Sequence, residues 1–462
     1  MAEGYDFDLI VIGAGPGGYE AAFEAAEKGM KTALVEKDKV GGTCLNRGCI
    51  PTKTLMHSAE LYRAARESSD IGIEAGDVRI DMDKVIDRKE EVTRTLRDGI
   101  LATAKKKKVQ VFEAAAEVTA AHRVVLRPTD GGEEQTLTAE NILVATGSKP
   151  FLPPIPGADL PGVLTSDELL DLREKPDALV IIGGGVIGAE FATIFHDIGT
   201  EVTVIEALDR MLPTMDKELG RGLQMNFKKR GIDVHAGSRV EEIRAEGGKL
   251  ICCYTEKNEE KEAAGDKILI CTGRRPMTEG LFSEELLASA PLLTERGFLA
   301  VDADHKTPVE GLYGIGDVTG GIMLAHVATA QGRCAVAVMK GEEPPIRLDV
   351  VPGCIYTDPE IAEIGMSQDK AKEAGIPVIT KKIPMSANGK TVLEGLDRGI
   401  IKLVAREEDH VLIGASLMCG RASDIAAECS LAIASGLTLE QVGAAIHPHP
   451  TFAEAVCEAA RG

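Results

Sequence analysis

The chain has 462 residues, a length typical of about three domains. Its 73 acidic and 52 basic residues give a formal net charge of −21, which argues against a nucleic-acid or anionic-membrane partner. No apolar run approaches the roughly 18 residues of a membrane span. The N-terminus leads straight into a predicted strand, without a signal peptide. We therefore expect a reducing cytoplasm, where paired cysteines are more often catalytic than structural.

The N-terminal segment predicts a dinucleotide-binding fold. A strand over Phe7–Ile12 leads into the turn Gly13–Gly18, then a helix over Tyr19–Lys28 and a strand over Lys31–Val35 that ends at Glu36. Glycines in such a turn allow a pyrophosphate to approach the backbone, and the helix N-terminus favours its negative charge. The acid can accept hydrogen bonds from ribose hydroxyls. Strand, glycines, helix and terminal acid together predict nucleotide binding much more strongly than the glycines alone.

The stretch Gly41–Lys53 follows and carries two cysteines five positions apart, Cys44 and Cys49, ahead of a helix predicted over Thr52–Arg66. Five residues span about one and a half helical turns, so the sulfurs can close a ring only where the helix starts and the backbone is irregular. A disulfide that closes so short a loop constrains the unfolded chain little and adds little stability. The spacing therefore indicates a reactive disulfide rather than a structural one. Two isolated cysteines at this spacing would most often be unrelated core residues, but the surrounding motif favours a redox pair.

The first pattern returns in the middle of the chain. Its parts are a strand over Ala178–Ile182, the turn Gly183–Gly188, a helix over Ala189–Ile198, and a strand over Glu201–Ile205 that ends at Glu206. In both copies the acid lies 23 positions after the first glycine. We therefore predict two dinucleotide-binding folds; the alternative is two doubly wound domains without nucleotides. A carboxylate that accepts from both ribose hydroxyls repels a 2′-phosphate, so Glu206 favours NAD over NADP.

Later segments complete the predicted sheets and add a further domain. The expected strands are Asn141–Gly147, Lys267–Gly273 and Gly311–Asp317, the last ending in an acid; a helix is expected over Leu324–Lys340. Residues 346–462 combine short strands at Ile400–Ala405 and Val411–Met418 with an alanine-rich helix over Ala422–Ser435. This mixture reads as an α+β domain without its own glycine turn.

Two dinucleotide folds and a cysteine pair suggest an electron relay. A nicotinamide exchanges hydride with a flavin, and a flavin exchanges electrons with a disulfide. One sulfur must then contact the flavin while the other meets the substrate, and both must be able to ionise.

The chain resembles the FAD- and NAD-dependent disulfide oxidoreductases from end to end, and within them the dihydrolipoamide dehydrogenase branch. The motifs that carry the resemblance are Gly13–Gly18, Gly41–Lys53, Ala145–Gly147, Gly183–Glu190, Gly273–Pro276, Gly314–Asp317, Met323–His326 and His447–Glu454. It implies an α/β fold with two Rossmann-like dinucleotide-binding domains and a C-terminal α+β dimerisation domain. The implied boundaries are 1–150 for the FAD domain, 151–276 for the NAD domain, 277–345 for the return of the FAD domain and 346–462 for the interface of a homodimer.

The resemblance also implies residue roles. The FAD adenosine and pyrophosphate would be held by Gly13, Gly15, Gly18 and Glu36, and the flavin contacted by Lys53, paired with Glu190, and by Gly147, Asp317 and Ala325. NAD would be bound by Gly183, Gly185, Gly188, Glu206, Val240 and Gly273. Cys49 would be the thiol beside the flavin, and Cys44 the thiol that exchanges with the substrate. One departure is Ala115, in a segment where many relatives carry a glycine that contacts FAD.

His449 is the expected acid–base residue. Pro448 and Pro450 restrict its backbone, and Glu454 can hold one ring nitrogen, so that the oriented imidazole exchanges a proton with a thiol. The resemblance implies that this base comes from the other subunit of the homodimer. By default a histidine with an acid five residues on is a surface feature. His447 is the less favoured base.

The expected function is oxidation of dihydrolipoamide on lipoyl domains of a 2-oxo acid dehydrogenase, acetoin or glycine cleavage complex, with reduction of NAD. The alternative is a glutathione-like or mercuric reductase. However, no basic residue of the NADPH-binding kind directly follows Glu206, and Cys457 stands alone where mercuric reductases carry a vicinal pair. A flavin transhydrogenase would lack the cysteine pair, and a non-catalytic scaffold would not need Cys44, Cys49 and His449 together. No metal is expected.

Overall fold

The computed structural model describes residues 4–396 and 399–462. Its contacts divide the chain into two compact units: Met1–Thr54, Lys84–Phe151 and Gly273–Leu348 form the first, and Leu55–Asp83, Leu152–Thr272 and Asp349–Gly462 form the second. Each unit contains one of the two glycine turns. The second unit also contains Asp349–Gly462, nearly all of the predicted C-terminal domain, and the four domain boundaries given above stay predictions.

The first unit is built on a parallel sheet whose central strands are buried on both faces. The strands pair in the order β3 (Gln110–Ala120), β2 (Thr32–Glu36), β1 (Phe7–Ile12), β5 (Gln135–Val144) and β16 (Leu312–Gly314). β4 (Arg123–Pro128) joins β3 to β5 in an antiparallel meander. Ile10 and Ile12 enter one hydrophobic cluster while Leu9 and Val11 enter the other, which explains why this strand is a continuous apolar run.

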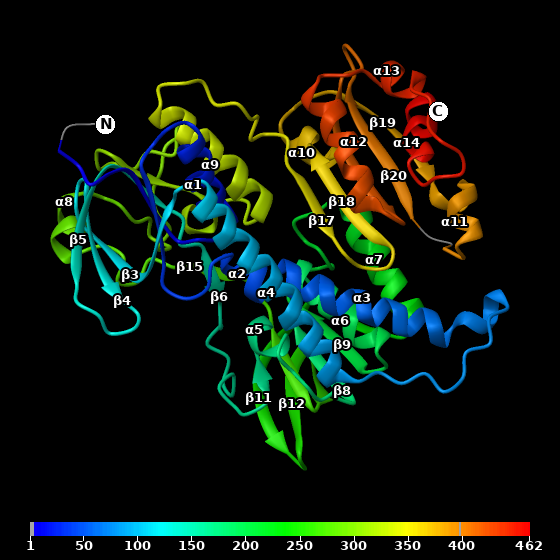
Figure 1. Cartoon of the computed structure of the whole chain (residues 1–462). Coiled ribbons are helices and arrows are strands. Elements are labelled where there is room, and N and C mark those ends of the chain that lie inside the picture. Colours follow the sequence, from blue (N-terminus) through cyan, green and yellow to red (C-terminus); the bar gives the residue numbers. More distant parts are fainter. Residues whose placement is uncertain (1–3, 397–398) are drawn as a thin grey trace. The chain divides into compact units, whose positions relative to one another are not determined.

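Helices α1 (Pro16–Glu27) and α9 (Ala325–Met339) lie side by side against this sheet (Figure 1). Small residues allow the approach: a β-carbon on Gly17 would lie 2.9 Å from the carbonyl oxygen of Ala328, and one on Gly332 would lie 2.8 Å from that of Gly17. The first helix begins three residues earlier than predicted, because Pro16 is tolerated in the first turn, where its missing N–H is not needed.

The second unit repeats this arrangement, as predicted. Its parallel strands pair in the order β10 (Asp233–Ala236), β9 (Glu201–Glu206), β8 (Ala178–Ile182), β14 (Lys267–Ile270) and β7 (Val163–Leu164), and α6 (Val186–Asp197) follows β8. Leu9 lies opposite Thr32 in the first unit, and Leu179 lies opposite Val202 in the second, so the 23-residue offset recurs in the strand register. The predicted start of α6 at Ala189 was three residues late, because a β-branched Val186 is accommodated at the helix start.

The C-terminal segment forms an antiparallel sheet covered by helices, which confirms the α+β prediction. Its strands pair in the order β17 (Pro352–Ile355), β18 (Glu360–Gly365), β21 (Leu412–Cys419), β20 (Ile400–Arg406) and β19 (Val378–Pro384). The helices α12 (Ala422–Ala434), α13 (Leu439–Ala444) and α14 (Glu454–Arg461) share one hydrophobic cluster with it.

The remaining elements connect these sheets or extend them. They are α2 (Gly42–Arg47), α3 (Cys49–Arg66), η1 (Ser68–Ile71), α4 (Met82–Lys106), β6 (Ser148–Pro150), α5 (Ser166–Leu169), α7 (Lys217–Arg230), β11 (Ser238–Glu246), β12 (Lys249–Glu256), β13 (Glu259–Gly265), β15 (Arg274–Pro276), α8 (Glu284–Ser289), η2 (Gly316–Thr319), α10 (Gln368–Glu373), η3 (Met385–Ala387) and α11 (Gly389–Leu393).

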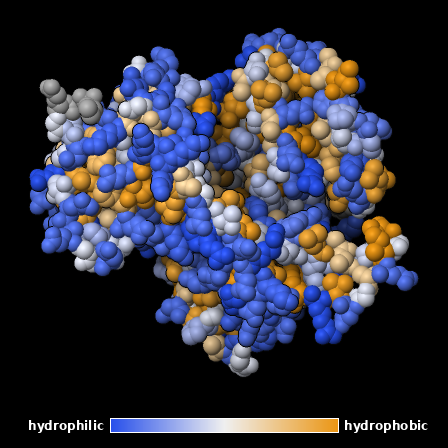
Figure 2. Space-filling view, in the orientation of Figure 1, coloured by the Kyte–Doolittle hydropathy of each residue, from blue (hydrophilic) through white to orange (hydrophobic). Residues whose placement is uncertain are grey.

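Hydrophilic residues dominate the face shown in Figure 2, with apolar residues scattered among them. Over the described ranges 4–396 and 399–462, no helix combines the length and apolarity needed to cross a membrane.

A buried cluster of ion pairs ties together helices of the second unit. Asp197 in α6, only 4% exposed, contacts Arg63 in α3 at 3.6 Å (Nε to Oδ2) and also pairs with Arg230 in α7. Both arginines also contact Asp358. Burial raises the pKa of the Asp197 carboxyl to about 6, against the lowering effect of the two arginines.

This burial predicts a pH-dependent contribution to stability. Because the folded-state pKa of Asp197 lies above its ordinary value of 3.8, the carboxyl stabilises the fold fully below about pH 4 and loses that contribution as the pH rises through about 6. The difference is worth about 3 kcal/mol. We expect the free energy of unfolding of Asp197→Asn, measured by urea denaturation, to improve relative to the parent by roughly 2 kcal/mol between pH 4 and pH 7, because part of the change already occurs below pH 4. A difference that does not vary with pH would contradict this.

Candidate active site

In the first glycine turn, a side chain on Gly13 or Gly18 would collide with neighbouring backbone, whereas Gly15 faces open space. Gly13 has a φ of +100°, and a β-carbon there would lie 2.4 Å from the carbonyl oxygen of Ala145. A β-carbon on Gly18 would lie 1.9 Å from the carbonyl oxygen of Gly13. Around Gly15, by contrast, only the Cα of Gly42 comes within 4 Å, and no side chain caps the N-terminus of α1. This open, uncapped helix start fits a pyrophosphate.

The second turn repeats the geometry. Gly183 has a φ of +119°, and its β-carbon would lie 2.7 Å from the carbonyl oxygen of Cys271. A β-carbon on Gly188 would lie 1.9 Å from the carbonyl oxygen of Gly183, whereas one on Gly185 would meet no atom within 4 Å. The outer glycines are therefore required by the fold, and the middle one leaves space for a nucleotide.

The acid after each second strand hydrogen-bonds its own glycine turn. Glu36 accepts from the N–H of Ala14 at 2.8 Å, and Glu206 accepts from the N–H of Gly184 at 2.5 Å. The second oxygen of each carboxylate accepts from a backbone N–H two residues on, in Asp38 and Leu208. A carboxylate has about four lone-pair sites, so these contacts leave room for the predicted hydrogen bonds to ribose.

The cysteines lie on two successive helices. α2 ends at Arg47, Gly48 has a non-helical φ of −147° and ψ of −114°, and α3 begins at Cys49 rather than at the predicted Thr52. The irregular backbone expected between the sulfurs is therefore present. Over the described residues the cysteines are thiols. A hydrogen bond with Cys49, and then burial, raise the pKa of the Cys44 thiol, while the positive charge of Lys53 acts to lower it.

Asn46 and Arg97, which were not predicted as site residues, hold α2, the helix that carries Cys44, in place. The Asn46 side-chain amide donates to the carbonyl oxygens of Val40 at 3.0 Å and Gly42 at 2.9 Å, and Arg97 donates to the Asn46 Oδ1 at 3.0 Å. Gly41 donates to the carbonyl oxygen of Ala14 at 2.7 Å, so α2 starts against the nucleotide turn. The position of Asn46 between the cysteines was the available signal; nothing in the sequence pointed to Arg97.

The predicted flavin contacts Gly147 and Asp317 follow adjacent parallel strands, β5 and β16. Asp317 accepts from the Ser148 hydroxyl at 2.5 Å, and that hydroxyl accepts from Arg274 at 2.7 Å. Ala325 is the first residue of α9, which has no side-chain cap. No local pattern marks Arg274, because its partners Asp317 and Ser148 are 43 and 126 positions away in the sequence.

The predicted contact between His449 and Glu454 is present in the second unit. The His449 Nδ1 lies 2.8 Å from the Glu454 Oε2, and the imidazole is 77% exposed while the carboxylate is 12% exposed. The second histidine, His447, contacts Glu428 instead, at 2.6 Å. The exposed ring with one nitrogen held is suited to proton exchange with a partner molecule. Its role in catalysis stays a prediction.

Four further residues from the sequence-based site lie elsewhere in the fold, and their roles stay predictions. Glu190 is buried in α6 and accepts from the N–H of Tyr356 at 3.2 Å; its pairing with Lys53 would join the two units and stays a prediction. Val240 in β11 packs beside a hydrophobic cluster, and Gly273, with a φ of +149°, precedes β15. Ala115 lies within β3, opposite Arg127.

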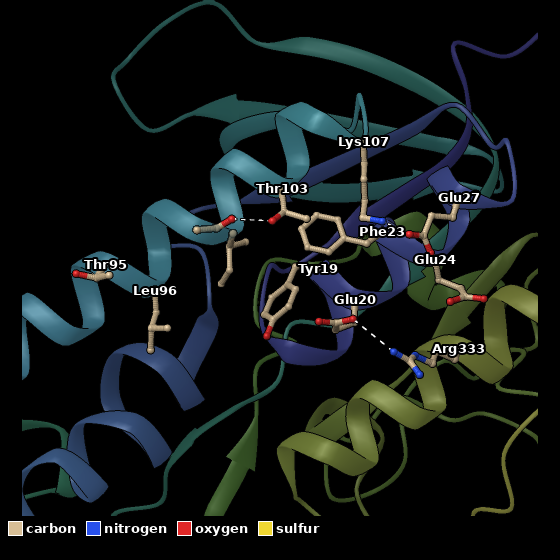
Figure 3. A pocket seen from close by; sticks show the side chains of 12 residues that line it. Tyr19, Glu20, Phe23, Glu24, Glu27, Thr95, Leu96, Thr103, Lys107 and Arg333 are labelled. Carbon is tan, nitrogen blue, oxygen red and sulfur yellow. Dashed lines mark hydrogen bonds and ion pairs between the residues drawn. The ribbon is translucent and has the colours of Figure 1, made fainter.

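A hollow of about 570 Å³ opens on the first unit beside α1, α4 and α9 (Figure 3). Its lining combines aromatic and aliphatic side chains, such as Phe23 and Leu96, with ion-paired ones, such as Arg333 and Glu20. Burial, and then the negative charge of Glu20, raise the pKa of the Tyr19 phenol in this lining. None of the predicted site residues lines it.

Comparison with known proteins decides the family. A family model described as pyridine nucleotide-disulphide oxidoreductase matches residues 7–332, and the dimerisation domain of the same family matches residues 351–460. The chain belongs to the pyridine nucleotide-disulphide oxidoreductases. It is accordingly a flavoprotein oxidoreductase that uses FAD and NAD, as predicted, and it carries the dimerisation domain of the family.

Members of this family match the chain over nearly its whole length. Dihydrolipoyl dehydrogenases from Bacillus subtilis and Haloferax volcanii are 38% and 40% identical to it, over 98% of this chain and 97% and 95% of theirs. Among solved structures, LpdA from Mycobacterium tuberculosis superposes with a TM-score of 0.89 at 29% identity, over 98% of this chain and 99% of that one. The flavoprotein disulfide reductase RclA from Escherichia coli superposes with a TM-score of 0.86 at 28% identity, with the same coverage. The predicted fold class is confirmed.

The two kinds of glycine predict two different defects. Gly185→Ala, where a β-carbon meets open space, should keep the thermal unfolding midpoint of the parent and weaken NADH binding by about tenfold or more. Gly188→Ala forces a β-carbon against a backbone oxygen and should lower the midpoint as well. Thermal unfolding and NADH titration of the two purified variants check this, and equal midpoints would contradict it.

Proposed function

We propose that the chain is a dihydrolipoyl dehydrogenase that oxidises protein-bound dihydrolipoyl groups and reduces NAD. The observation that carries the proposal is the Cys44–Cys49 pair, held in hydrogen-bond contact next to the first nucleotide turn. The names and full-length similarity of the curated relatives support the choice of substrate.

The pair suits exchange with a small dithiol. In its oxidised form, a substrate thiolate attacks Cys44, the Cys44–Cys49 bond breaks, and Cys49 leaves as a thiolate. The second thiol of the substrate then attacks the substrate sulfur that is bonded to Cys44. The substrate–Cys44 bond breaks, and Cys44 is released. The substrate leaves as a cyclic disulfide, and the protein is left with two thiols. Bound FAD would supply two-electron redox chemistry between these thiols and NAD.

His449 would handle the protons. With Nδ1 held by Glu454, the Nε2 of the exposed ring can take the proton of the attacking substrate thiol and return it to a departing thiolate. In a homodimer, this histidine would serve the cysteines of the partner.

The nucleotides would be held by the residues predicted from the sequence. For FAD these are Gly13, Gly15, Gly18, Glu36, Lys53, Gly147, Asp317 and Ala325; for NAD they are Gly183, Gly185, Gly188, Glu206, Val240 and Gly273. The expected partners are a second copy of the chain and the lipoyl domains of a multienzyme complex in the cytoplasm.

A second candidate is reduction of another disulfide. It is favoured by the similarity to RclA, which is described as a disulfide reductase. Steady-state rates with dihydrolipoamide and NAD, compared with glutathione disulfide and NADPH or NADH, separate the two. The lipoyl substrate should give the higher kcat/KM, and preference for glutathione disulfide would favour the second candidate.

Replacing the exchange thiol should remove the activity without removing the cofactor. Cys44→Ser should lose detectable oxidation of dihydrolipoamide and remain yellow with FAD, because serine cannot form the mixed disulfide. Cys253→Ser, in β12 of the other unit, is the matched control and should keep the parent rate. Full activity in Cys44→Ser would refute the role of this thiol.

Loss of the acid–base group should slow turnover without abolishing it. We expect His449→Gln to lower kcat for dihydrolipoamide by about 10²–10⁴-fold, the usual contribution of a positioned acid–base side chain. His447→Gln removes the neighbouring imidazole, which contacts Glu428, and should stay within a few-fold of the parent. Similar effects of the two replacements would mean that His449 has no special role.

A further inference from the structure

A charged side chain is buried in the middle of a strand of the C-terminal sheet. Lys402 in β20 is 3% exposed, and its Nζ lies 2.5 Å from the Oδ2 of Asp216 and 3.1 Å from the Oε1 of Glu218. Burial acts to lower the pKa of Lys402, but the hydrogen bonds to these two carboxylates outweigh it, so the ammonium stays charged. Removing a lysine and an aspartate from water costs free energy that their mutual attraction often does not repay. A buried pair of this kind is therefore a candidate for a functional role.

Asp216, itself 4% exposed, fixes the start of α7. Its Oδ1 accepts from the N–H of Glu218 at 2.9 Å, which caps the helix, while its own N–H donates to Glu363 of β18 at 2.5 Å. The hydroxyl of Ser416 in β21 also donates to the Oδ2 of Asp216 at 3.5 Å, so three strands of the C-terminal sheet hold one residue of the segment that follows β9.

The other end of that segment holds the second glycine turn. Glu206 accepts from the N–H of Gly184, and Leu212 donates to the carbonyl oxygen of Gly184 at 2.9 Å. Leu212 does this with a φ of +50°, a left-handed conformation that a leucine rarely adopts. Such strain persists only where the surroundings enforce it, and it often marks a functional segment. Residues 206–216 thus form a strap from the glycine turn to Asp216.

The first unit has the same strap with a different anchor. There Glu36 accepts from the N–H of Ala14, and Gly41 donates to the carbonyl oxygen of Ala14. That strap continues into α2, which Asn46 and Arg97 secure within the same unit. The second strap has no cysteine helix at this point and is secured instead by Lys402 and Glu363.

We infer that Lys402 is a positioning residue for NAD: by holding Asp216 it fixes the 206–216 strap against the second glycine turn, and so keeps Gly185 and Glu206 in the geometry that binds the nucleotide. The inference rests on the predicted NAD contacts of those two residues and not on the identity of the dithiol substrate.

The test uses the FAD-loaded enzyme and an assay that needs no dithiol, the reduction of ferricyanide by NADH. Lys402→Met should raise KM for NADH by about tenfold, within the usual range of coupling between sites, while kcat at saturating NADH stays within about twofold. Lys382→Met is the matched control, because Lys382 pairs with the Oε2 of Glu218 rather than with Asp216. This variant should keep the parent KM for NADH. A fall in kcat with KM unchanged would overturn the inference.

A double variant separates positioning from simple loss of stability. Lys402→Met alone leaves a buried carboxylate without its cation and can unfold the protein, whereas Lys402→Met with Asp216→Asn removes both charges and keeps a good helix cap. We expect the double variant to recover the thermal unfolding midpoint and to retain the raised KM for NADH. A parental KM in the double variant would overturn the inference. If neither variant folds, the Lys402–Asp216 pair has a purely structural role, and the inference is overturned as well.

Discussion

The structure depends on the close approach of backbone to backbone at the two glycine turns. In each nucleotide fold, the helix starts so near the end of the first strand that a β-carbon on Gly18 or Gly188 would lie 1.9 Å from a carbonyl oxygen. This approach brings an uncapped helix N-terminus to the carboxyl edge of a parallel sheet, with an open space at Gly15 and Gly185. Backbone N–H groups, the positive end of the helix and a missing side chain together suit the binding of an anion.

The acid that follows each second strand has a structural role besides its expected contact with ribose. Glu36 and Glu206 hold the backbone of the turn, and the chain that leaves each acid folds back onto the same residue of that turn. In the first unit this return delivers the chain into the helix that carries Cys44. In the second it delivers the chain to Asp216 and the C-terminal sheet. The same arrangement therefore links the first glycine turn to the helix that carries Cys44, and the second glycine turn to the C-terminal sheet.

The chemistry of the chain is divided between the units. Cys44, Cys49 and the first glycine turn lie in one unit, and the second glycine turn with the His449–Glu454 pair lies in the other. The ring of His449 is exposed although Glu454 is nearly buried, so the pair is rigid at one end and accessible at the other. That combination suits a group that exchanges protons with a bound partner molecule.

The sequence alone determined the features that follow local rules. Alternating buried strands and glycine turns predicted both nucleotide folds, the repeated 23-residue offset predicted their equivalence, and the proline-flanked His449 with Glu454 predicted their contact. Helix starts were missed by three residues at Pro16, Val186 and Cys49, because a first helical turn tolerates residues that periodicity does not mark as helical. The tertiary structure alone decided the contacts of Asn46 with Arg97, of Ser148 with Arg274, and of Asp216 with Lys402. These partners lie 51, 126 and about 186 positions apart, and the choice of a partner at such distances is made by the packing of sheets and helices, which no short-range pattern records.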